Sequence, residues 1–349
     1  MRRACTGIVL FVLVLFSVSS VYADRGMIPV SPDVSVYEPG QKAIVAWNGQ
    51  EEILILSTDV TSSSETLVLE LLPLPSEPEV EPASFRSFEE IQRLIWEEGL
   101  NQFMYSAEKD ARGGSVEVVF HEEIGAHNIT VVRATDASEL VDWIESFLQA
   151  NGVDETVSLG DFEPAVKDYM GRGFRYYVLD LITVTSDERS VDPILYRFNS
   201  SFLYYPLVIT NPVPGETEII LFLLTEGKVN EDCQPMQRAH YQVMGEGPKP
   251  IEFVLSKGDI SKVDLRVGEL FDDGAWLTVL KYDGRLNLLT RDLMIAEEAL
   301  NPADTLNVEV VLPSMLIALC ILLGAACTLV GVGWALLITR WKKGSAKTD

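Results

Sequence analysis

Short apolar stretches separated by turn residues dominate the first part of the chain. Residues 42–47 and 53–57 flank Asn48-Gly49, a dipeptide that favours the positive φ angles of a tight hairpin turn. A third stretch, residues 66–72, ends at Pro73, the start of a proline-rich segment that a central strand would not tolerate. The pattern predicts a β-hairpin followed by a separate strand.

Three later segments have an apolar period of about 3.6 residues and are predicted to be helices. The first carries Ser87 and Glu90 at the spacing of a capping box. The second opens at Asp136 and stops at Asn151-Gly152, and the third runs from Glu163 to Met170.

Strand patterns lie on both sides of these helices. Together they predict an α+β fold, rich in antiparallel strands and with about three helices. Residues 211–215, Asn-Pro-Val-Pro-Gly, form the expected internal boundary. The other predicted strands are residues 116–120, 129–132, 174–184, 194–198, 207–210, 217–225, 239–244, 251–255 and 275–281.

The N-terminus has the pattern of a secretory signal. Arg2 and Arg3 precede the uncharged apolar run 8–16, and Val21-Tyr22-Ala23 places small residues at a cleavage site. An uncleaved anchor is the alternative, but the run is shorter than the ~20 residues that a spanning helix needs.

The C-terminal end predicts a single transmembrane helix. Residues 312–338 contain no charged side chain and are followed by a basic segment that begins at Arg340. At ~1.5 Å per residue the run is long enough to cross ~30 Å of hydrocarbon. Because basic residues gather on the cytoplasmic side of membranes, the C-terminus is expected inside.

These features predict a single-pass type I protein of the plasma membrane, with its ectodomain outside the cell and a helix in contact with membrane lipid. Small residues such as Gly324 and Gly331 in the membrane run would let a second helix approach closely, which is compatible with a homo-oligomer. The expected parts are a signal peptide (1–23), an α+β ectodomain (24–211), its strand-rich C-terminal part (212–305), a juxtamembrane linker (306–311), a transmembrane helix (312–339) and a cytoplasmic tail (340–349).

The region between the two ends is strongly acidic. Residues 24–311 hold 21 of the 27 Lys and Arg and 51 of the 52 Asp and Glu, which gives 21 − 51 = −30. This charge argues against nucleic acid and anionic lipid as partners. Only Cys233 of the four cysteines lies in this region, so it is free or pairs between chains. Asn128 and Asn199 begin N-glycosylation sequons.

A series of motifs resembles a family of secreted or membrane-anchored bacterial and archaeal proteins, known as a domain of unknown function. The resemblance covers residues 24–225 and implies a prokaryotic owner and an anchored location, but no catalytic residues. The motifs are Trp47-Asn48-Gly49-Gln50-Glu51-Glu52 leading into Leu54-Ile55-Leu56-Ser57, Pro73-Leu74-Pro75-Ser76, Gly125 with Ile129 and Val131, a helix with Leu140 and Trp143, Asn151-Gly152, Phe174 with Tyr177 and Val178, and Tyr205-Pro206-Leu207.

His121, Glu122, Glu123 and His127 are the one local cluster of metal-ligand types. A zinc-protease helix has its two histidines four residues apart, whereas these are six apart in a strand–turn–strand pattern. On an unbroken strand they would lie ~20 Å from each other. We interpret them as solvated edge residues, which only a turn at Gly125 could bring together.

The other candidate residues are also interpreted as structural. A reactive Cys233–His240 pair is disfavoured because Glu231 and Asp232 oppose activation of the thiol. Solvated turns account for Asp272-Asp273-Gly274 and Glu297-Glu298, and core positions on strands account for Tyr176-Tyr177 and Phe202-Tyr204-Tyr205.

No catalytic, cofactor-binding or metal-binding residue is therefore predicted, and no cofactor. The sequence favours a noncatalytic module of the cell surface, with a binding or envelope-structural role toward an unknown extracellular protein or polymer. The alternative is a surface hydrolase, metal-assisted through His121, Glu122 and His127.

Overall fold

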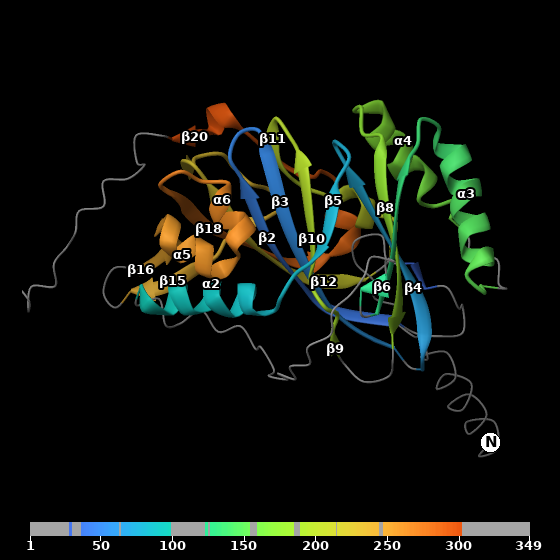
Figure 1. Cartoon of the computed structure of the whole chain (residues 1–349), viewed down its shortest axis with the longest axis horizontal. Helices are drawn as coiled ribbons and strands as arrows, with labels where there is room; N and C mark the ends of the chain where they lie inside the picture. The colour runs from blue at the N-terminus through green and yellow to red at the C-terminus, as the bar shows by residue number, and fades with distance from the viewer. Residues whose placement is uncertain are drawn as a thin grey trace, which may run out of the picture. The chain divides into compact units, whose positions relative to one another are not determined.

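The computed structural model describes residues 28–29, 36–62, 64–98, 123–124, 126–153, 159–184, 189–213, 215–243 and 247–301. The chain divides into two compact units, residues 1–305 and 306–349, and every described residue belongs to the first. Two large β-sheets and five α-helices make up this described part (Figure 1). The predicted α+β class, rich in antiparallel strands, is confirmed.

The first sheet has five strands, all antiparallel, in the order β1-β4-β8-β7-β6. Its two long central strands, β4 and β8, pair along their whole length from Thr66 opposite Val184 to Leu74 opposite Tyr176. The strands are β1 (Ile28–Pro29), β4 (Thr66–Leu74), β6 (Glu123–Ile124), β7 (His127–Arg133) and β8 (Tyr176–Val184).

The second sheet has nine strands, with the main order β14-β18-β12-β2-β3-β10-β5 and with β17 and β9 paired to β18 and β3. β12 pairs with β2 in parallel, and the other pairs are antiparallel. The strands are β2 (Val36–Trp47), β3 (Glu51–Ser62), β5 (Glu79–Pro82), β9 (Arg189–Ser190), β10 (Ile194–Asn199), β12 (Glu216–Thr225), β14 (Gln237–Arg238), β17 (Glu252–Ser256) and β18 (Gly274–Arg285).

Short strands and helices complete the described part. Three two-stranded sheets pair β11 (Phe202–Tyr205) with β19 (Leu293–Ala296), β13 (Lys228–Val229) with β20 (Leu300–Asn301), and β15 (His240–Val243) with β16 (Gly247–Pro250). The helices are α2 (Arg86–Glu97), α3 (Ala137–Ala150), α4 (Glu163–Gly171), α5 (Lys257–Val263), α6 (Leu265–Glu269) and the 3-10 turns η1 (Val208–Thr210), η2 (Leu286–Leu288) and η3 (Glu297–Ala299).

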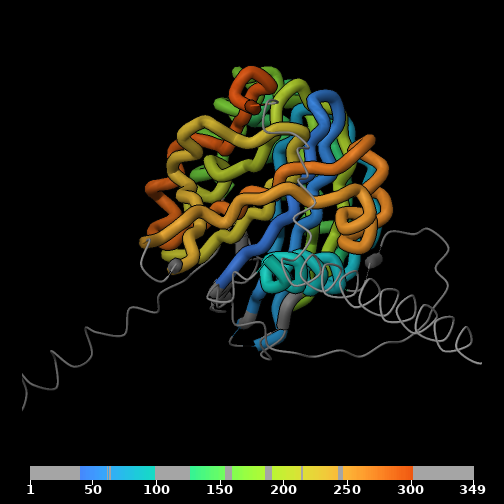
Figure 2. Tube along the Cα trace, turned by 90° about the vertical axis from the view of Figure 1, so that its left-hand side faces the viewer, coloured from blue at the N-terminus to red at the C-terminus, as the bar shows by residue number. Residues whose placement is uncertain are grey.

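The second sheet is buried on both faces, which explains its continuous apolar strands. Successive side chains of a strand point to opposite faces. Val45 and Trp47 of β2 belong to the apolar cluster shared with the first sheet, whereas Ile44 and Ala46 belong to the cluster with α2, α5 and α6. Helices α2 and α5, far apart in the sequence, lie side by side on that outer face (Figure 2).

Helices α3 and α4 contribute apolar side chains to the cluster around the first sheet. The β7 strand alternates, so that His127 and Ile129 point toward the second sheet and Asn128 points toward α3. There the Asn128 amide donates to Asn151 Oδ1 over 3.3 Å. The order of layers is therefore helices, second sheet, first sheet, helices.

The hairpin predicted at Asn48-Gly49 is present between β2 and β3. Gly49 has a φ of 89°, which a residue with a side chain rarely adopts. The Asn48 side chain accepts from the Gln50 and Glu51 amides at 3.1 and 2.9 Å, and so fixes the turn. Strands from both sides of residues 211–215 join this same sheet through β2 and β12.

The prediction of about three helices was too low, because α5 and α6 were missed. They have seven and five residues, too few to show an apolar period. Their cap residues are the remaining signal: Ser256 Oγ accepts from the Asp259 amide, and the Asp264 carboxylate accepts from the Arg266 amide.

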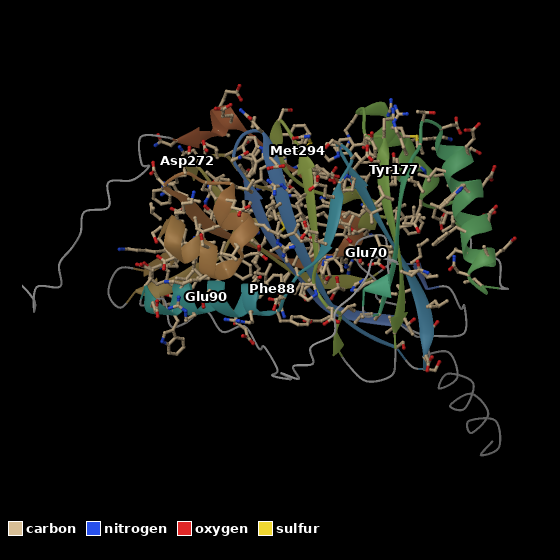
Figure 3. The ribbon with its side chains drawn as sticks, in the orientation of Figure 1. Glu70, Phe88, Glu90, Tyr177, Asp272 and Met294 are labelled. Carbon is tan, nitrogen blue, oxygen red and sulfur yellow. The ribbon has the colours of Figure 1, made fainter. Side chains whose placement is uncertain are left out.

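The capping box predicted from Ser87 and Glu90 is also wrong. α2 begins at Arg86, whose amide donates to Ser84 Oγ, and Ser87 is buried within the first turn. Glu90 instead accepts from Arg93 on the outer side of the helix. Phe88, on the inner side, packs edge-on against Phe222 with ring centroids 6.5 Å apart (Figure 3).

Of two further strand predictions, one is wrong and the other falls on residues that the structure does not describe. Residues 207–210 were predicted to be a strand, but they form the turn η1, and the strand lies earlier, at β11. The strand predicted over residues 116–120 lies outside the described residues, as does the membrane helix predicted over 312–339. Among the described residues, no helix has the length and apolarity needed to cross a membrane.

Gly274 permits the close approach of β17 and β18. A Cβ at this position would lie 2.3 Å from the Leu255 carbonyl oxygen. We expect Gly274→Ala to lower the free energy of unfolding by about 1–3 kcal/mol, measured by urea denaturation, because backbone atoms must move. Gly258→Ala in α5 is the control, since its nearest contact would be an ordinary 3.7 Å. Equal effects of the two substitutions would contradict the predicted clash.

Candidate functional site

A cluster of ionisable side chains lies buried between the two sheets. Glu70 of β4 and Asp180 of β8 are directly opposite each other in the first sheet, and His127 begins the neighbouring strand β7. Because the three positions share one face of the sheet, their side chains gather on the side that packs against the second sheet. Figure 3 marks Glu70 in this interior.

The cluster surrounds a very small cavity. Its volume is about 10 Å³, which is close to the minimum that can hold one water molecule. Strands β3 and β10 of the second sheet close it from the other side through Thr58 and Tyr196. A substrate of several atoms has no room here.

His127 makes a hydrogen bond through each ring nitrogen. Nδ1 lies 2.5 Å from Asp180 Oδ2, and Nε2 lies 2.9 Å from the Asp192 carbonyl oxygen. A carbonyl oxygen only accepts, so Nε2 carries a proton, and a carboxylate at Nδ1 favours a second proton there. This arrangement stabilises the doubly protonated imidazolium.

The electrostatic balance agrees with this protonation state. Burial lowers the pKa of His127, but the hydrogen bond and the negative charge of Asp180 outweigh burial, and Glu70 adds to their effect. The pKa of His127 is therefore raised above its usual value. An imidazolium has no lone pair for a metal ion or for proton abstraction, so this geometry makes His127 a structural cation.

A second buried carboxylate, Asp292, joins α4 to the turn η1. Asp292 Oδ1 accepts from the Tyr169 hydroxyl and from the amides of Leu207 and Val208 at 2.7, 2.7 and 2.8 Å. Asp292 Oδ2 accepts from Arg172 at 2.7 Å, and the guanidinium carbon lies 4.3 Å from the centre of the Tyr169 ring. The carboxylate is fully enclosed and its donors are held by packing, so its role is to fix these elements together.

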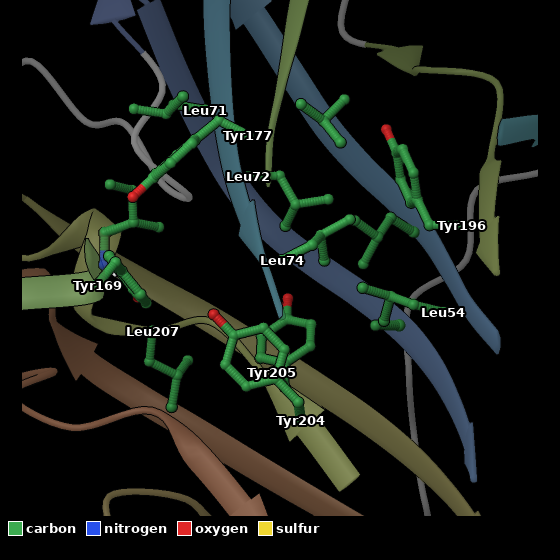
Figure 4. Packing of buried hydrophobic residues seen from close by; sticks show 14 of the residues in the cluster. Leu54, Leu71, Leu72, Leu74, Tyr169, Tyr177, Tyr196, Tyr204, Tyr205 and Leu207 are labelled. Carbon is green, nitrogen blue, oxygen red and sulfur yellow. Dashed lines mark hydrogen bonds between the residues drawn. The ribbon is translucent and has the colours of Figure 1, made fainter. Parts of the chain in front are cut away.

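Glu52 is a third buried carboxyl, at the centre of the core. Its Oε2 accepts from the Tyr204 amide at 2.7 Å. Burial raises the pKa of Glu52 well above its usual value, against a smaller lowering by the Tyr204 amide. Tyr204 and Tyr205 lie in the surrounding apolar cluster, with Leu207 and Leu54 (Figure 4).

The structure revises the interpretation of the histidine cluster. His127 was predicted to be a solvated edge residue, but it is only 5% exposed, because β7 is covered by the second sheet. Strands β6 and β7 pair antiparallel, with Ile124 opposite His127. His121, Glu122 and the Glu123 side chain lie outside the described residues.

The structure also places the other candidate residues. Cys233 is a buried free thiol, and burial is the main cause that raises the pKa of this thiol. Its Sγ contacts the Glu231 carbonyl oxygen at 3.5 Å. His240 is exposed. The carboxylates at Asp272-Asp273 and Glu297-Glu298 are exposed, and Tyr177, Tyr204 and Tyr205 are fully buried, with Tyr176 and Phe202 half-buried.

The sequence-based reasoning missed Glu70, Asp180, Asp292 and Glu52. A signal for two of them exists: Glu70 and Asp180 each interrupt an otherwise apolar strand, Leu-Val-Leu-Glu-Leu-Leu and Val-Leu-Asp-Leu-Ile. A charge in such a run requires a buried partner. Which partner it has depends on strand pairing, which the sequence alone did not supply.

The fold and these buried networks define a class of protein: an α+β protein with two stacked β-sheets and a core stabilised by enclosed charges. A family described as "uncharacterized protein conserved in bacteria (DUF2330)" matches residues 20–264. This match spans 245 of the 349 residues, and the chain belongs to that family. The matched region extends past residue 225, where the resemblance in the sequence ended.

Solved structures give distant similarities. The chain is similar to the crystal structure of baculovirus P35 at 12% identity and a TM-score of 0.42, covering 76% of this chain and 97% of that one. It is also similar to a mutated baculovirus P35 after caspase cleavage, at 2.7 Å resolution, with 10% identity, a TM-score of 0.40, and 74% and 99% of the two chains covered. No curated protein matches the chain.

Proposed function

We propose that this chain is a single-pass protein of the bacterial plasma membrane that displays an acidic α+β domain outside the cell. The domain acts as a noncatalytic binding or structural module of the envelope. Its partner is an extracellular protein or polymer, and membrane lipid surrounds residues 312–339.

The enclosure of His127 supports the noncatalytic part of this proposal. Both of its ring nitrogens donate to acceptors in a cavity of about 10 Å³, so it is available neither to a substrate nor to a metal ion. The second histidine that the hydrolase alternative needs is His121, outside the described residues.

The distribution of charge supports the proposed location. The uncharged run 312–338 is followed by Arg340, Lys342, Lys343 and Lys347, and the excess of acidic residues lies before it. Positive residues next to a membrane helix favour the cytoplasmic side. This charge distribution supports an outside location for the acidic part of the chain.

Protease treatment of sealed spheroplasts tests this orientation. With an epitope placed after Lys347, we expect the domain before residue 312 to be digested and a small membrane-bound fragment to keep the epitope. Permeabilised spheroplasts are the control, because there the epitope should be lost as well. A second variant that ends at residue 305 should leave the membrane fraction.

Two outcomes would reject the proposed location. One is loss of the epitope in spheroplasts that are demonstrably sealed, which would reverse the orientation. The other is a variant ending at residue 305 that stays in the membrane fraction after high-salt washing, which would place the anchor elsewhere.

A further inference from the structure

His127 connects the two sheets through a single side chain. Its strand, β7, and its partner Asp180 on β8 belong to the first sheet. The Asp192 carbonyl, bound by Nε2, lies between β9 and β10 of the second sheet. One imidazole therefore holds a strand of one sheet against a connection in the other.

We propose that His127 is a proton-dependent staple, which holds the two sheets together while its ring is doubly protonated and releases the β9–β10 connection when the ring loses a proton. This inference concerns regulation of the fold by pH. It does not depend on the proposed location or partner.

The number of ring protons decides how many of the two hydrogen bonds can form. A neutral imidazole has one N–H group, while both of its partners here are acceptors. If Nδ1 keeps the proton, the bond from Nε2 to the Asp192 carbonyl is lost. If Nε2 keeps it, the Asp180 carboxylate loses its donor in a buried place, which is unfavourable because a buried charge needs a partner.

The charged groups beside His127 favour the protonated ring, whereas burial opposes it. Asp180 approaches from β8 and Glu70 from β4, and both carry carboxyl groups. Across the cavity, Thr58 and Tyr196 come from β3 and β10 of the second sheet. No Lys or Arg is among the residues that line this described cavity.

The direction of the pH effect follows from this environment. The pKa of His127 is raised in the folded protein, so the ring binds its proton more tightly there than in the unfolded chain. Its contribution to stability is complete below about pH 6.5 and is lost as the pH rises through the folded-state pKa. Both hydrogen bonds of His127 therefore form at low pH, and the bond to the Asp192 carbonyl is lost at high pH.

Other contacts also hold the segment that the staple releases: the Ala83 amide donates to the Pro193 carbonyl at 2.8 Å, and the Val191 side chain is buried. β9 has two residues, Arg189 and Ser190, which pair with Val60 and Asp59 of β3. The Val191 amide donates to the Thr58 carbonyl at 2.9 Å. Loss of the bond to Asp192 therefore removes one of several restraints on this connection.

The test is thermal unfolding of the full chain in detergent between pH 6 and pH 9, for the wild type, His127→Gln and His240→Gln. We expect the melting temperature of the wild type to fall with pH relative to that of His127→Gln, by about 2–3 °C for each unit by which the folded-state pKa exceeds 6.5. His240 is exposed, so His240→Gln should keep the wild-type profile. Identical profiles of the wild type and His127→Gln would overturn the proposal.

A direct measurement covers the case in which His127→Gln fails to fold. The full chain is labelled with ¹⁵N in its histidine rings, and the ring signals are followed from pH 5 to pH 10. A His127 signal that stays in the imidazolium form above pH 6.5 supports the staple. A neutral ring at pH 6.5, with a single protonated nitrogen, overturns it.

Discussion

Asp292→Ala is expected to lower the free energy of unfolding by about 3–5 kcal/mol, measured by urea denaturation of the full chain. The carboxylate satisfies two backbone amides, the Tyr169 hydroxyl and the Arg172 guanidinium. Removing it leaves the two amides and the Tyr169 hydroxyl buried without this acceptor, and each such group is unfavourable by about 1–3 kcal/mol.

Asp168→Ala is the matched control for this prediction. Asp168 binds the same guanidinium, with Oδ2 2.9 Å from Arg172 Nε, but its side chain is 55% exposed. A surface ion pair of this kind contributes at most about 1 kcal/mol. If both substitutions had equally small effects, Asp292 would not be the residue that fixes α4 to η1.

Trp47→Ala should have an effect of similar size, about 3–5 kcal/mol, by the same measurement. The Trp47 ring is fully buried between the two sheets, and its Nε1 donates to the Ser200 carbonyl at 2.9 Å. Replacement leaves a cavity in the core and removes this hydrogen bond. Trp47→Phe keeps most of the ring volume, so its loss should be smaller, about 1–3 kcal/mol.

Trp96 provides the comparison, because it is the same residue type in an exposed place. It lies near the end of α2 with 65% of its surface exposed. Trp96→Ala should change the free energy of unfolding by no more than about 0.5 kcal/mol. A larger loss at Trp96 than at Trp47 would contradict the assignment of the core.

Much of the fold could be predicted because its signals are local. The Asn48-Gly49 turn, the Asp136 cap and the glycines after α3 and α4 all act within a few residues, and each marks a real boundary. The prediction of a capping box at Ser87 was wrong because serine, which suits a cap position, is also tolerated within the first turn of a helix. Ser87 lies within that first turn and is buried against the sheet.

The candidate site could not be predicted from the sequence because its contacts join residues that are far apart in the chain. His127 and Asp180 are 53 residues apart, and His127 and Asp192 are 65 apart. A histidine at the start of a short, mixed strand has no pattern that separates a solvated edge from a covered one. Only the packing of the second sheet on the first decides that His127 is enclosed.

The parallel pairing of β2 with β12 has a consequence for how the chain folds. β2 can pair with β3 early, through a short turn. Its other edge can pair only after residues 216–225, nearly 180 positions later, have been added to the fold. Contacts of such long sequence separation form slowly, because closing the loop has a large entropic penalty. Until then β2 presents an open, apolar strand edge to solvent, which is a template for association with other chains. A folding helper that covers β2 during this interval would therefore raise the yield of the folded protein.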